Sequence, residues 1–289
     1  MAIVISGKEL SQTLKSQMAE DIKGYRKIYP RIPHLAVIMV GDNPGSVSYV
    51  TGKEKACTLL GIKNTTFRLN DRVSQKTILE LIDSLNSDDS VDGILIQLPL
   101  PKRMDEAKII SSVRADKDVD GFHPLNVAGL WTKKPCILPC TPKGIMEILK
   151  SIDVDLKGKN VVVMGRSNIV GLPIAKLMID ADATVTICHS KTKNMAEVTK
   201  KADVLIVAIG KPKFVTEEYV KEGAIVIDVG VNRDEETNKL CGDVDFDSVE
   251  PKASYITKVP GGVGPMTITC LMQNTIQAFL KHMENKEEM

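Results

Sequence analysis

The chain has 289 residues, of which 43% are hydrophobic and 26% are charged, proportions typical of a globular protein long enough for two domains. Its 38 Lys and Arg residues nearly cancel its 37 Asp and Glu residues, and the net charge of +1 provides no global field for nucleic acid or an anionic membrane surface. The six cysteines form no C-x-x-C pair, and no signal peptide or membrane-spanning apolar run is visible, so we expect reduced thiols, no metal site and a soluble, unprocessed cytoplasmic protein.

The first half of the chain alternates short apolar runs with segments in which apolar residues recur every three or four positions. The apolar runs predict strands at 35–40, 65–69 and 91–98, and the periodic segments predict helices at 48–61 and 74–86. Because the strand runs are almost continuously apolar, we expect them to be buried on both faces, as in a parallel βαβ sheet.

A second series of elements follows a passage rich in Pro and Gly at 123–142, which we interpret as a domain boundary. Thr141 is placed to cap a helix that begins there. Strands are then predicted at 160–165, 183–189, 203–210 and 223–231, with helices at 168–180 and 194–202 and a final helix at 268–283. The fold class is therefore α/β, with two domains that each contain a largely parallel sheet flanked by helices.

The turn GRSNIVG at 165–171 lies where the strand 160–165 passes into a helix. Its small residues suit a phosphate, because backbone N–H groups at a helix N-terminus need room to reach an anion. The turn matches neither the G-x-G-x-x-G nor the G-x-x-x-x-G-K-[ST] motif. Its position at the end of the first strand of the second sheet nevertheless favours a nucleotide site of the Rossmann type.

The residues around this turn favour NADP over NAD. A NAD-binding unit places an Asp or Glu about 20 residues further on to hold the ribose hydroxyls. The next strand ends instead in Cys188-His189-Ser190-Lys191, and these donors, with Arg166, suit a 2′-phosphate. Arg166 as a solvated loop residue is the alternative. The glycine-rich loop 258–267 is either a second ligand contact or a hinge before the last helix.

Candidate catalytic residues lie in the first half of the chain. Tyr49 and Lys53 are four apart in a predicted helix and share one face, and Gly52 between them indicates that another segment packs closely there. A desolvated Lys53 could act as a base, although a solvated lysine also fits its charged neighbourhood. Gln97 ends a buried strand and either contacts a ligand or satisfies the core, and Asp120 is either a turn residue or a carboxylate facing a heterocycle.

Nine motifs, in order over essentially the whole chain, resemble one family, that of bifunctional methylenetetrahydrofolate dehydrogenase and methenyltetrahydrofolate cyclohydrolase. The motifs are SYVTGKEKAC, GILIQLPLP, KDVDGFHPLN, PCTPKGI, GRSNIVGLPIA, CHSKT, IDVGVN, GDVDF and VPGGVGPMT. The resemblance implies a folate substrate, NADP as cofactor and a cytoplasmic homodimer. It implies a substrate domain at 1–140 completed by 268–289, a Rossmann-type NADP domain at 141–267, and an active site in the cleft between them.

The resemblance also implies roles for individual residues. Lys53 is the expected general base, Tyr49 positions the folate, Gln97 tunes the protonation of Lys53, and Asp120 holds the pterin ring. Substrate contacts are implied for Tyr49, Gln97, Leu98, Asp120 and Pro265. Cofactor contacts are implied for Thr141, Gly165, Arg166, Ser167, Ile169, His189, Ser190, Val231 and Gly262. Two other hypotheses are a shikimate-type NADP-dependent dehydrogenase and a nucleotide-sensing module without turnover.

Overall fold

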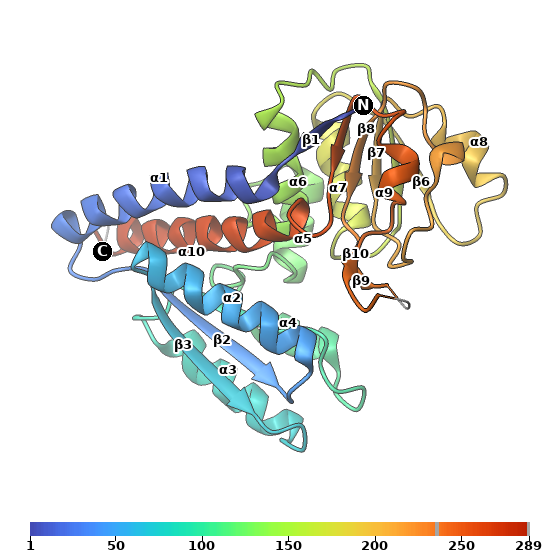
Figure 1. Ribbon diagram of the computed structural model, residues 1–289. Coiled ribbons are helices and arrows are strands. Elements are labelled where there is room, and N and C mark those ends of the chain that lie inside the picture. The colour runs from blue at the N-terminus through green and yellow to red at the C-terminus, as the bar shows by residue number, and fades with distance from the viewer. Residues whose placement is uncertain (235–236, 288–289) are drawn as a thin grey trace. The chain divides into compact units, whose positions relative to one another are not determined.

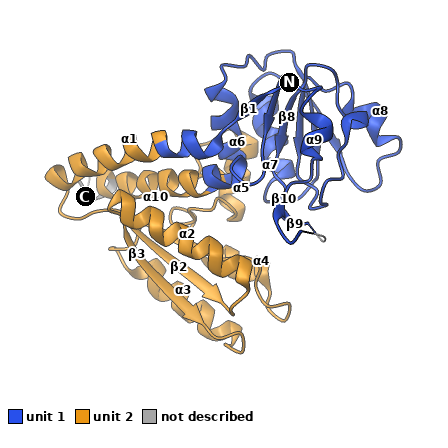
Figure 2. Cartoon of the chain, viewed as in Figure 1, with its two compact units in different colours: residues 1–12, 141–267 blue, residues 13–140, 268–289 orange. Residues whose placement is uncertain are grey.

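The computed structural model describes residues 1–234 and 237–287 (Figure 1). The chain divides into two compact units: unit 1 comprises Met1–Gln12 and Thr141–Thr267, and unit 2 comprises Thr13–Cys140 and Ile268–Met289 (Figure 2). Residues 288 and 289, the end of the predicted segment 268–289, lie outside the described residues. Both units are α/β with a parallel sheet, so the predicted fold class is confirmed.

Residues 1–12 lie in a different unit than predicted. The sequence placed them in the substrate domain 1–140, whereas in the structure they belong to unit 1, together with Thr141–Thr267. The strand β1 (Ile3–Ile5) pairs in parallel with β11 (Tyr255–Thr257), with Val4 opposite Ile256. A three-residue strand gives too short a pattern for its pairing to be read from sequence. Its partner strand, β11, lies some 250 residues further along the chain, and the structure shows the pairing directly.

The sheet of unit 2 is built around β2 (His34–Val40), which lies between β3 (Lys63–Leu69) and β4 (Gly93–Ile96), all parallel. Every residue of β2 is buried, as its continuous apolar run predicts. Side chains alternate along a strand, so Leu35, Val37 and Met39 face one core and Ala36, Ile38 and Val40 face another.

Helices cover both faces of this sheet. The first core contains residues of α1 (Gly7–Ile28), α2 (Pro44–Leu60) and α10 (Val263–Glu287). The second core contains residues of α3 (Gln75–Ser87) and α4 (Glu106–Ser112). Two helices, α1 and α4, were not among the predicted elements, although α1 carries apolar residues every four positions at Leu10, Leu14, Met18 and Ile22.

The passage 123–142 is also more ordered than its Pro and Gly content indicates. It contains α5 (Pro124–Thr132) and the first turn of α6 (Cys140–Ser151). His123 caps α5 by accepting a hydrogen bond from Leu125 N, and Pro124 occupies the first helical turn, where its missing N–H costs nothing. The boundary between units falls at the end of this passage, after Cys140.

Unit 1 contains a six-stranded sheet in the order β1-β11-β8-β7-β5-β6, with every neighbouring pair parallel. Its remaining strands are β5 (Asn160–Met164), β6 (Thr184–Cys188), β7 (Val204–Val207) and β8 (Ile225–Asp228). The chain passes from β5 to β6 on one side and then crosses to β7 on the other. The carboxyl end of β5 is therefore a topological switch point, the place where open α/β sheets bind ligands.

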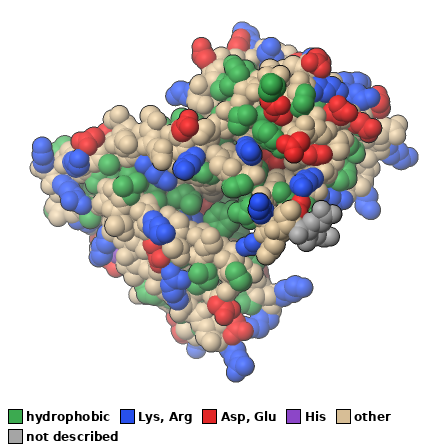
Figure 3. Space-filling view, viewed as in Figure 1, with side chains coloured by type: hydrophobic (Ala, Val, Ile, Leu, Met, Phe, Trp, Pro, Cys, Tyr) green, Lys and Arg blue, Asp and Glu red, His purple; other side chains and the backbone are tan. Residues whose placement is uncertain are grey.

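Short helices and one hairpin complete unit 1. The helices are α7 (Gly171–Asp180), α8 (Met195–Thr199), α9 (Phe246–Val249) and the 3-10 helix η1 (Glu217–Tyr219). The hairpin pairs β9 (Asn232–Arg233) with β10 (Leu240–Cys241). No helix of the described residues is long and apolar enough to cross a membrane. Charges of both signs are interspersed over the visible face, in keeping with the net charge of +1 (Figure 3).

Candidate active site

The centre of the site in unit 2 is a buried lysine on α2. Helix α2 is fixed at both ends, since the Asn43 side chain accepts hydrogen bonds from Gly45 N and Ser46 N, and Gly61 ends the helix in the left-handed conformation. Lys53 lies on the inner face of this helix and is only 8% exposed. The fold thus removes the ammonium group from most of its water.

Gln97 supplies the hydrogen-bond partner of this lysine. It directly follows β4, and its Oε1 accepts a hydrogen bond of 2.9 Å from Lys53 Nζ. Its Nε2 donates to Leu98 O at 2.7 Å, which fixes the orientation of the amide with its oxygen toward Lys53. The peptide bond from Leu98 to Pro99 is cis. Gln97 is therefore half-buried, and both ends of its amide have protein partners, one of them Lys53.

Asp120 belongs to the same cluster. Burial lowers the pKa of Lys53, while the charge of Asp120 opposes that shift. Burial raises the pKa of Asp120, and the charge of Lys53 opposes this shift in turn. The proton affinities of an amine and a carboxyl, normally far apart, are thus drawn toward each other, as is typical of groups that exchange protons in enzymes.

Cys140 completes the cluster and was not predicted as a site residue. Its thiol donates to Val119 O at 3.3 Å, and burial raises its pKa well above the usual value. The thiol is therefore neutral and unsuited to nucleophilic attack. The motif PCTPKGI contains this residue, but nothing in the local pattern distinguishes it from the five other cysteines, which are also free.

Tyr49 lies one helical turn before Lys53, and its side chain is 36% exposed, so it remains accessible to a ligand. Burial of the rest of the ring raises the pKa of its hydroxyl, which stays protonated and able to donate. A Cβ atom on Gly52 would lie 3.1 Å from Ile268 Cδ1, so the predicted close approach is present. Pro265, the remaining predicted substrate contact, belongs to unit 1.

The predicted cofactor turn in unit 1 joins β5 to α7. Gly165 has φ +120°, and a Cβ atom there would lie 2.2 Å from Ala208 O, so only glycine fits. A Cβ atom on Gly171 would lie 2.3 Å from Gly165 O. The Ser167 hydroxyl accepts hydrogen bonds from the N–H groups of Val170 and Gly171 and so holds the turn in shape. Arg166 and Ile169 on this turn are exposed.

The turn after β6 lies at the same edge of the sheet. Met164 and Cys188 are paired at the ends of the parallel strands β5 and β6, so Arg166 and Ser190 each follow their strand by two residues. His189 shapes this second turn, since its Nδ1 accepts from Lys191 N at 3.2 Å. Ser190 and Lys191 are exposed. The structure thus brings the predicted cationic and hydroxyl donors together at the switch point.

Two buried aspartates at this edge were missed by sequence reasoning. Asp228, at the end of β8, accepts hydrogen bonds from the N–H groups of Gly230, Asp243 and Val244. Burial raises its pKa to about 7 in spite of these donors. The carboxylate of Asp243 accepts from Ile209 N at 2.7 Å and from three further N–H donors, so the pair holds the loops after β7 and β8 in place. Both aspartates stand in motifs that the sequence shows, Asp228 in IDVGVN and Asp243 in GDVDF.

The remaining predicted cofactor residues are distributed over unit 1. Val231 follows these loops and is 48% exposed, whereas Gly262 is buried. Thr141 was predicted to cap α6, but the helix begins at Cys140 and encloses it. The Thr141 hydroxyl instead shares a hydrogen bond of 2.9 Å with the hydroxyl of Thr267. A helix start is read from sequence to within one or two residues, which accounts for this error.

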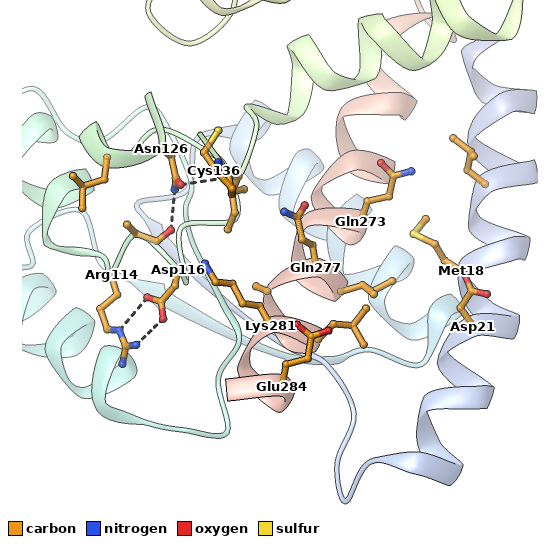
Figure 4. Close-up of a pocket in the computed structure, with 18 of the residues that line it drawn as sticks. Met18, Asp21, Arg114, Asp116, Asn126, Cys136, Gln273, Gln277, Lys281 and Glu284 are labelled. Atoms are coloured by element: carbon orange, nitrogen blue, oxygen red, sulfur yellow. Dashed lines mark hydrogen bonds and ion pairs between the residues drawn. The ribbon is translucent and has the colours of Figure 1, made fainter. Parts of the chain in front are cut away.

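A separate cavity of about 960 Å³ lies in unit 2, between α1, α10 and the loop that precedes α5 (Figure 4). None of the predicted site residues lines it. Asn126 in its wall donates to the carboxylate of Asp118 at 2.9 Å, and Asp118 in turn accepts from the N–H groups of Gly121 and His123. The wall of the cavity is thereby linked to the turn that carries Asp120.

A charged network borders this cavity. Arg114 pairs with Asp116 at 2.6 Å, and Asp116 contacts Nε2 of His282 at 3.2 Å. The other ring nitrogen of His282 lies 3.1 Å from Asp92, a buried carboxylate that pairs with Arg31 at 2.6 Å. Hydrogen bonds to Asp116 and Asp92 raise the pKa of His282, and the network ties α10 to the sheet of unit 2.

A nucleotide-type switch point in one α/β unit and a desolvated lysine beside a carboxyl in the other define a two-domain, nucleotide-dependent enzyme. Residues 5–120 match the tetrahydrofolate dehydrogenase/cyclohydrolase catalytic domain, and residues 139–283 match the NAD(P)-binding domain of the same family. The chain belongs to the tetrahydrofolate dehydrogenase/cyclohydrolase family, which confirms the resemblance seen in its motifs.

Individual relatives agree over the full length. The chain is 55% identical to the bifunctional protein FolD of Oceanobacillus iheyensis, over 96% of this chain and 97% of the relative. It superposes on the bifunctional FolD enzyme of Campylobacter jejuni with a TM-score of 0.94 and 48% identity, covering 96% of this chain and 98% of that one. The chain also superposes on the methylenetetrahydrofolate dehydrogenase-cyclohydrolase of Trypanosoma brucei, solved with NADP and an inhibitor. The TM-score is 0.94 at 36% identity, and the match covers 97% of this chain and 98% of that one.

Proposed function

We infer that this chain oxidises 5,10-methylenetetrahydrofolate to 5,10-methenyltetrahydrofolate with NADP and then hydrolyses the product to 10-formyltetrahydrofolate, as part of one-carbon metabolism. The observation that carries the inference is the buried Lys53, which donates to Gln97 and is electrostatically linked to Asp120. Membership of the dehydrogenase/cyclohydrolase family supports both reactions. It also makes the shikimate-type and non-catalytic alternatives unnecessary.

The cofactor fits the residues of unit 1. The edge of the sheet offers a turn in which glycines leave no room for Cβ atoms, together with the exposed donors Arg166, Ser190 and Lys191. Arg166 and Ser190 would hold the 2′-phosphate, with Ser167 and Ile169 along the cofactor. Thr141, Gly165, His189, Val231 and Gly262 are the further proposed contacts. When bound, NADP supplies the hydride acceptor.

The oxidation places few chemical demands on the protein. The methylene carbon between N5 and N10 of the folate loses a hydride readily, because the nitrogen lone pairs stabilise the resulting cation. The protein therefore mainly has to bind and orient the rings. We assign this task to Tyr49, Leu98 and Pro265, and to Asp120, whose carboxylate would accept N–H hydrogen bonds from the pterin ring.

The hydrolysis requires a base, because water must lose a proton as it attacks the methenyl carbon. Burial lowers the pKa of Lys53, so a larger share of the side chain is neutral at a given pH than in a solvated lysine. The neutral amine can keep its hydrogen bond to Gln97 Oε1 and direct its lone pair at the attacking water. In this role Gln97 orients Lys53. Because Gln97 Oε1 accepts from the amine as well as from the ammonium, Lys53 can lose a proton and keep its position.

The proposals for the oligomeric state and the cellular location of the protein rest on the family resemblance alone. We propose a cytoplasmic homodimer, and the six free thiols are in keeping with a reducing compartment. Size-exclusion chromatography with light scattering tests the first part of this proposal. A monomer at micromolar concentration would contradict it.

The function itself is tested by the initial rate of NADPH formation from 5,10-methylenetetrahydrofolate, with NAD in a parallel reaction. Decay of added 5,10-methenyltetrahydrofolate, above its spontaneous rate, measures the hydrolysis. We expect turnover in both assays and a preference for NADP. Absence of turnover with either cofactor would refute the dehydrogenase assignment.

A further inference from the structure

We propose that Asn274 on α10 is a positioning residue that sets where the Asp120 carboxyl lies relative to Lys53. This role rests on the proposed function, in which Lys53 and Asp120 act together. Its side-chain amide contacts Val119 O, Leu138 O and the sulfur of Cys140, so it would act through the backbone on which Asp120 is carried.

The amide of Asn274 joins two segments of unit 2. The residue is fully buried, at 0% exposure, and its Nδ2 lies 2.9 Å from both Val119 O and Leu138 O. The same nitrogen lies 3.5 Å from the sulfur of Cys140. Val119 immediately precedes Asp120, so this single side chain ties the carboxylate turn to the segment that leads into α6.

The other side of the turn is held independently. Asp118 accepts hydrogen bonds from Gly121 N at 3.2 Å and from His123 N at 2.7 Å. Gly121 has φ +76°, and a Cβ atom there would lie 2.6 Å from Pro139 N, so the turn is in contact with the segment that Asn274 also binds. Asp120 thus lies between two anchored neighbours, and Asn274 is the anchor that comes from a distant helix.

The chemistry of an amide suits this role. An NH₂ group offers two donors with a fixed angle between them, which matches two carbonyl acceptors on separate segments. Leucine has a similar size but takes the amide donor away from both buried carbonyls, and it leaves Val119 O with the weaker thiol donor of Cys140. The chain would then move to find other partners. We expect such a shift to move the Asp120 carboxyl away from Lys53, because the turn loses the donor that holds Val119 O.

The expected consequence has a definite sign. The charge of Asp120 opposes the lowering of the Lys53 pKa, so moving Asp120 away lowers that pKa further. The midpoint of Lys53 titration therefore moves to lower pH in Asn274→Leu. A misplacement of about 1 Å in an active site costs on the order of 100-fold in rate, which is the loss expected in hydrolysis of methenyltetrahydrofolate.

The experiment compares the full-length protein with Asn274→Leu and Asn274→Ser, the latter keeping one donor. The pH dependence of Lys53 labelling by an amine reagent, read by peptide mass spectrometry, reports the pKa of Lys53 without substrate. The kcat of the hydrolysis is measured beside it, and NADP affinity checks that unit 1 is folded. Asn64→Leu is the matched control, because Asn64 Nδ2 also donates to a backbone carbonyl of unit 2, Leu35 O at 3.3 Å.

We expect a lower labelling midpoint and a large loss of kcat in Asn274→Leu, smaller changes of the same sign in Asn274→Ser, and neither change in Asn64→Leu. Wild-type midpoints in a folded Asn274→Leu or Asn274→Ser protein would overturn the proposal, as would equal changes in the control. If the wild type shows no turnover but Asn274→Leu still lowers the labelling midpoint of Lys53, the proposed function is refuted and the positioning role remains supported.

Discussion

Replacement of Lys53 by methionine separates the two proposed reactions. Methionine has nearly the volume of lysine and a similar helix propensity, so α2 should persist. The change leaves Gln97 Oε1 without its donor, at a cost of about 1–3 kcal/mol. It also removes an ammonium group that is only 8% exposed and therefore poorly hydrated, which offsets part of that cost. The variant should fold with nearly unchanged stability.

The kinetic effect should be much larger than the effect on stability. Loss of a general base costs about 10²- to 10⁴-fold in rate, equivalent to about 3–5 kcal/mol of transition-state stabilisation. Hydride loss requires no base, so the oxidation should retain at least about tenfold more of its activity than the hydrolysis. Loss of the Lys53 charge also removes the interaction that opposes the rise in the Asp120 pKa, so this pKa rises further and folate binding weakens near neutral pH.

Both rates are measured on one preparation, the oxidation by NADPH absorbance and the hydrolysis by decay of methenyltetrahydrofolate. Lys55→Met is the matched control, because Lys55 lies two residues further along the same helix and is exposed. The control should behave as wild type. If Lys53→Met hydrolyses methenyltetrahydrofolate within about threefold of the wild-type kcat, Lys53 is not the base.

Three further predictions concern the cofactor turn and the network around His282. Arg166→Ala should raise the KM for NADP about tenfold, because one charge-assisted hydrogen bond to the cofactor is lost, and should leave the KM for NAD unchanged. Equal increases in both KM values would exclude a contact with the 2′-phosphate. Gly165→Ala should abolish detectable NADP binding, because its Cβ atom would lie 2.2 Å from a backbone oxygen; wild-type affinity in calorimetry would contradict this. His282→Gln should lose about 1–3 kcal/mol at pH 6 and less at pH 9, measured by urea unfolding. The pKa of His282 is raised in the folded state by Asp116 and Asp92, so its stabilisation is complete below the unfolded pKa and disappears as pH rises through the folded pKa. A deficit independent of pH would show that the imidazolium does not contribute.

The sequence by itself determined the class of fold and the location of the glycine turn between β5 and α7 that is proposed to bind the cofactor. Continuous apolar runs such as 35–40 predicted strands buried on both faces, and β2 is buried throughout. The glycines at 165 and 171 marked a turn in which a side chain would collide with the backbone. These are local properties, since periodicity and steric limits act over a few residues and are visible without any knowledge of distant contacts.

The tertiary structure alone decided which candidate residues lie together. The hydrogen bond from Lys53 to Gln97 joins residues 44 apart, and the amide of Asn274 reaches Val119 across 155 positions. Likewise, the pairing of β1 with β11 placed residues 1–12 in unit 1, against the predicted boundary. Contacts of this kind depend on strand order and on the packing of helices against the sheet. Burial, which lowers the pKa of Lys53, is likewise a property of that packing and not of the residues beside Lys53 in the chain.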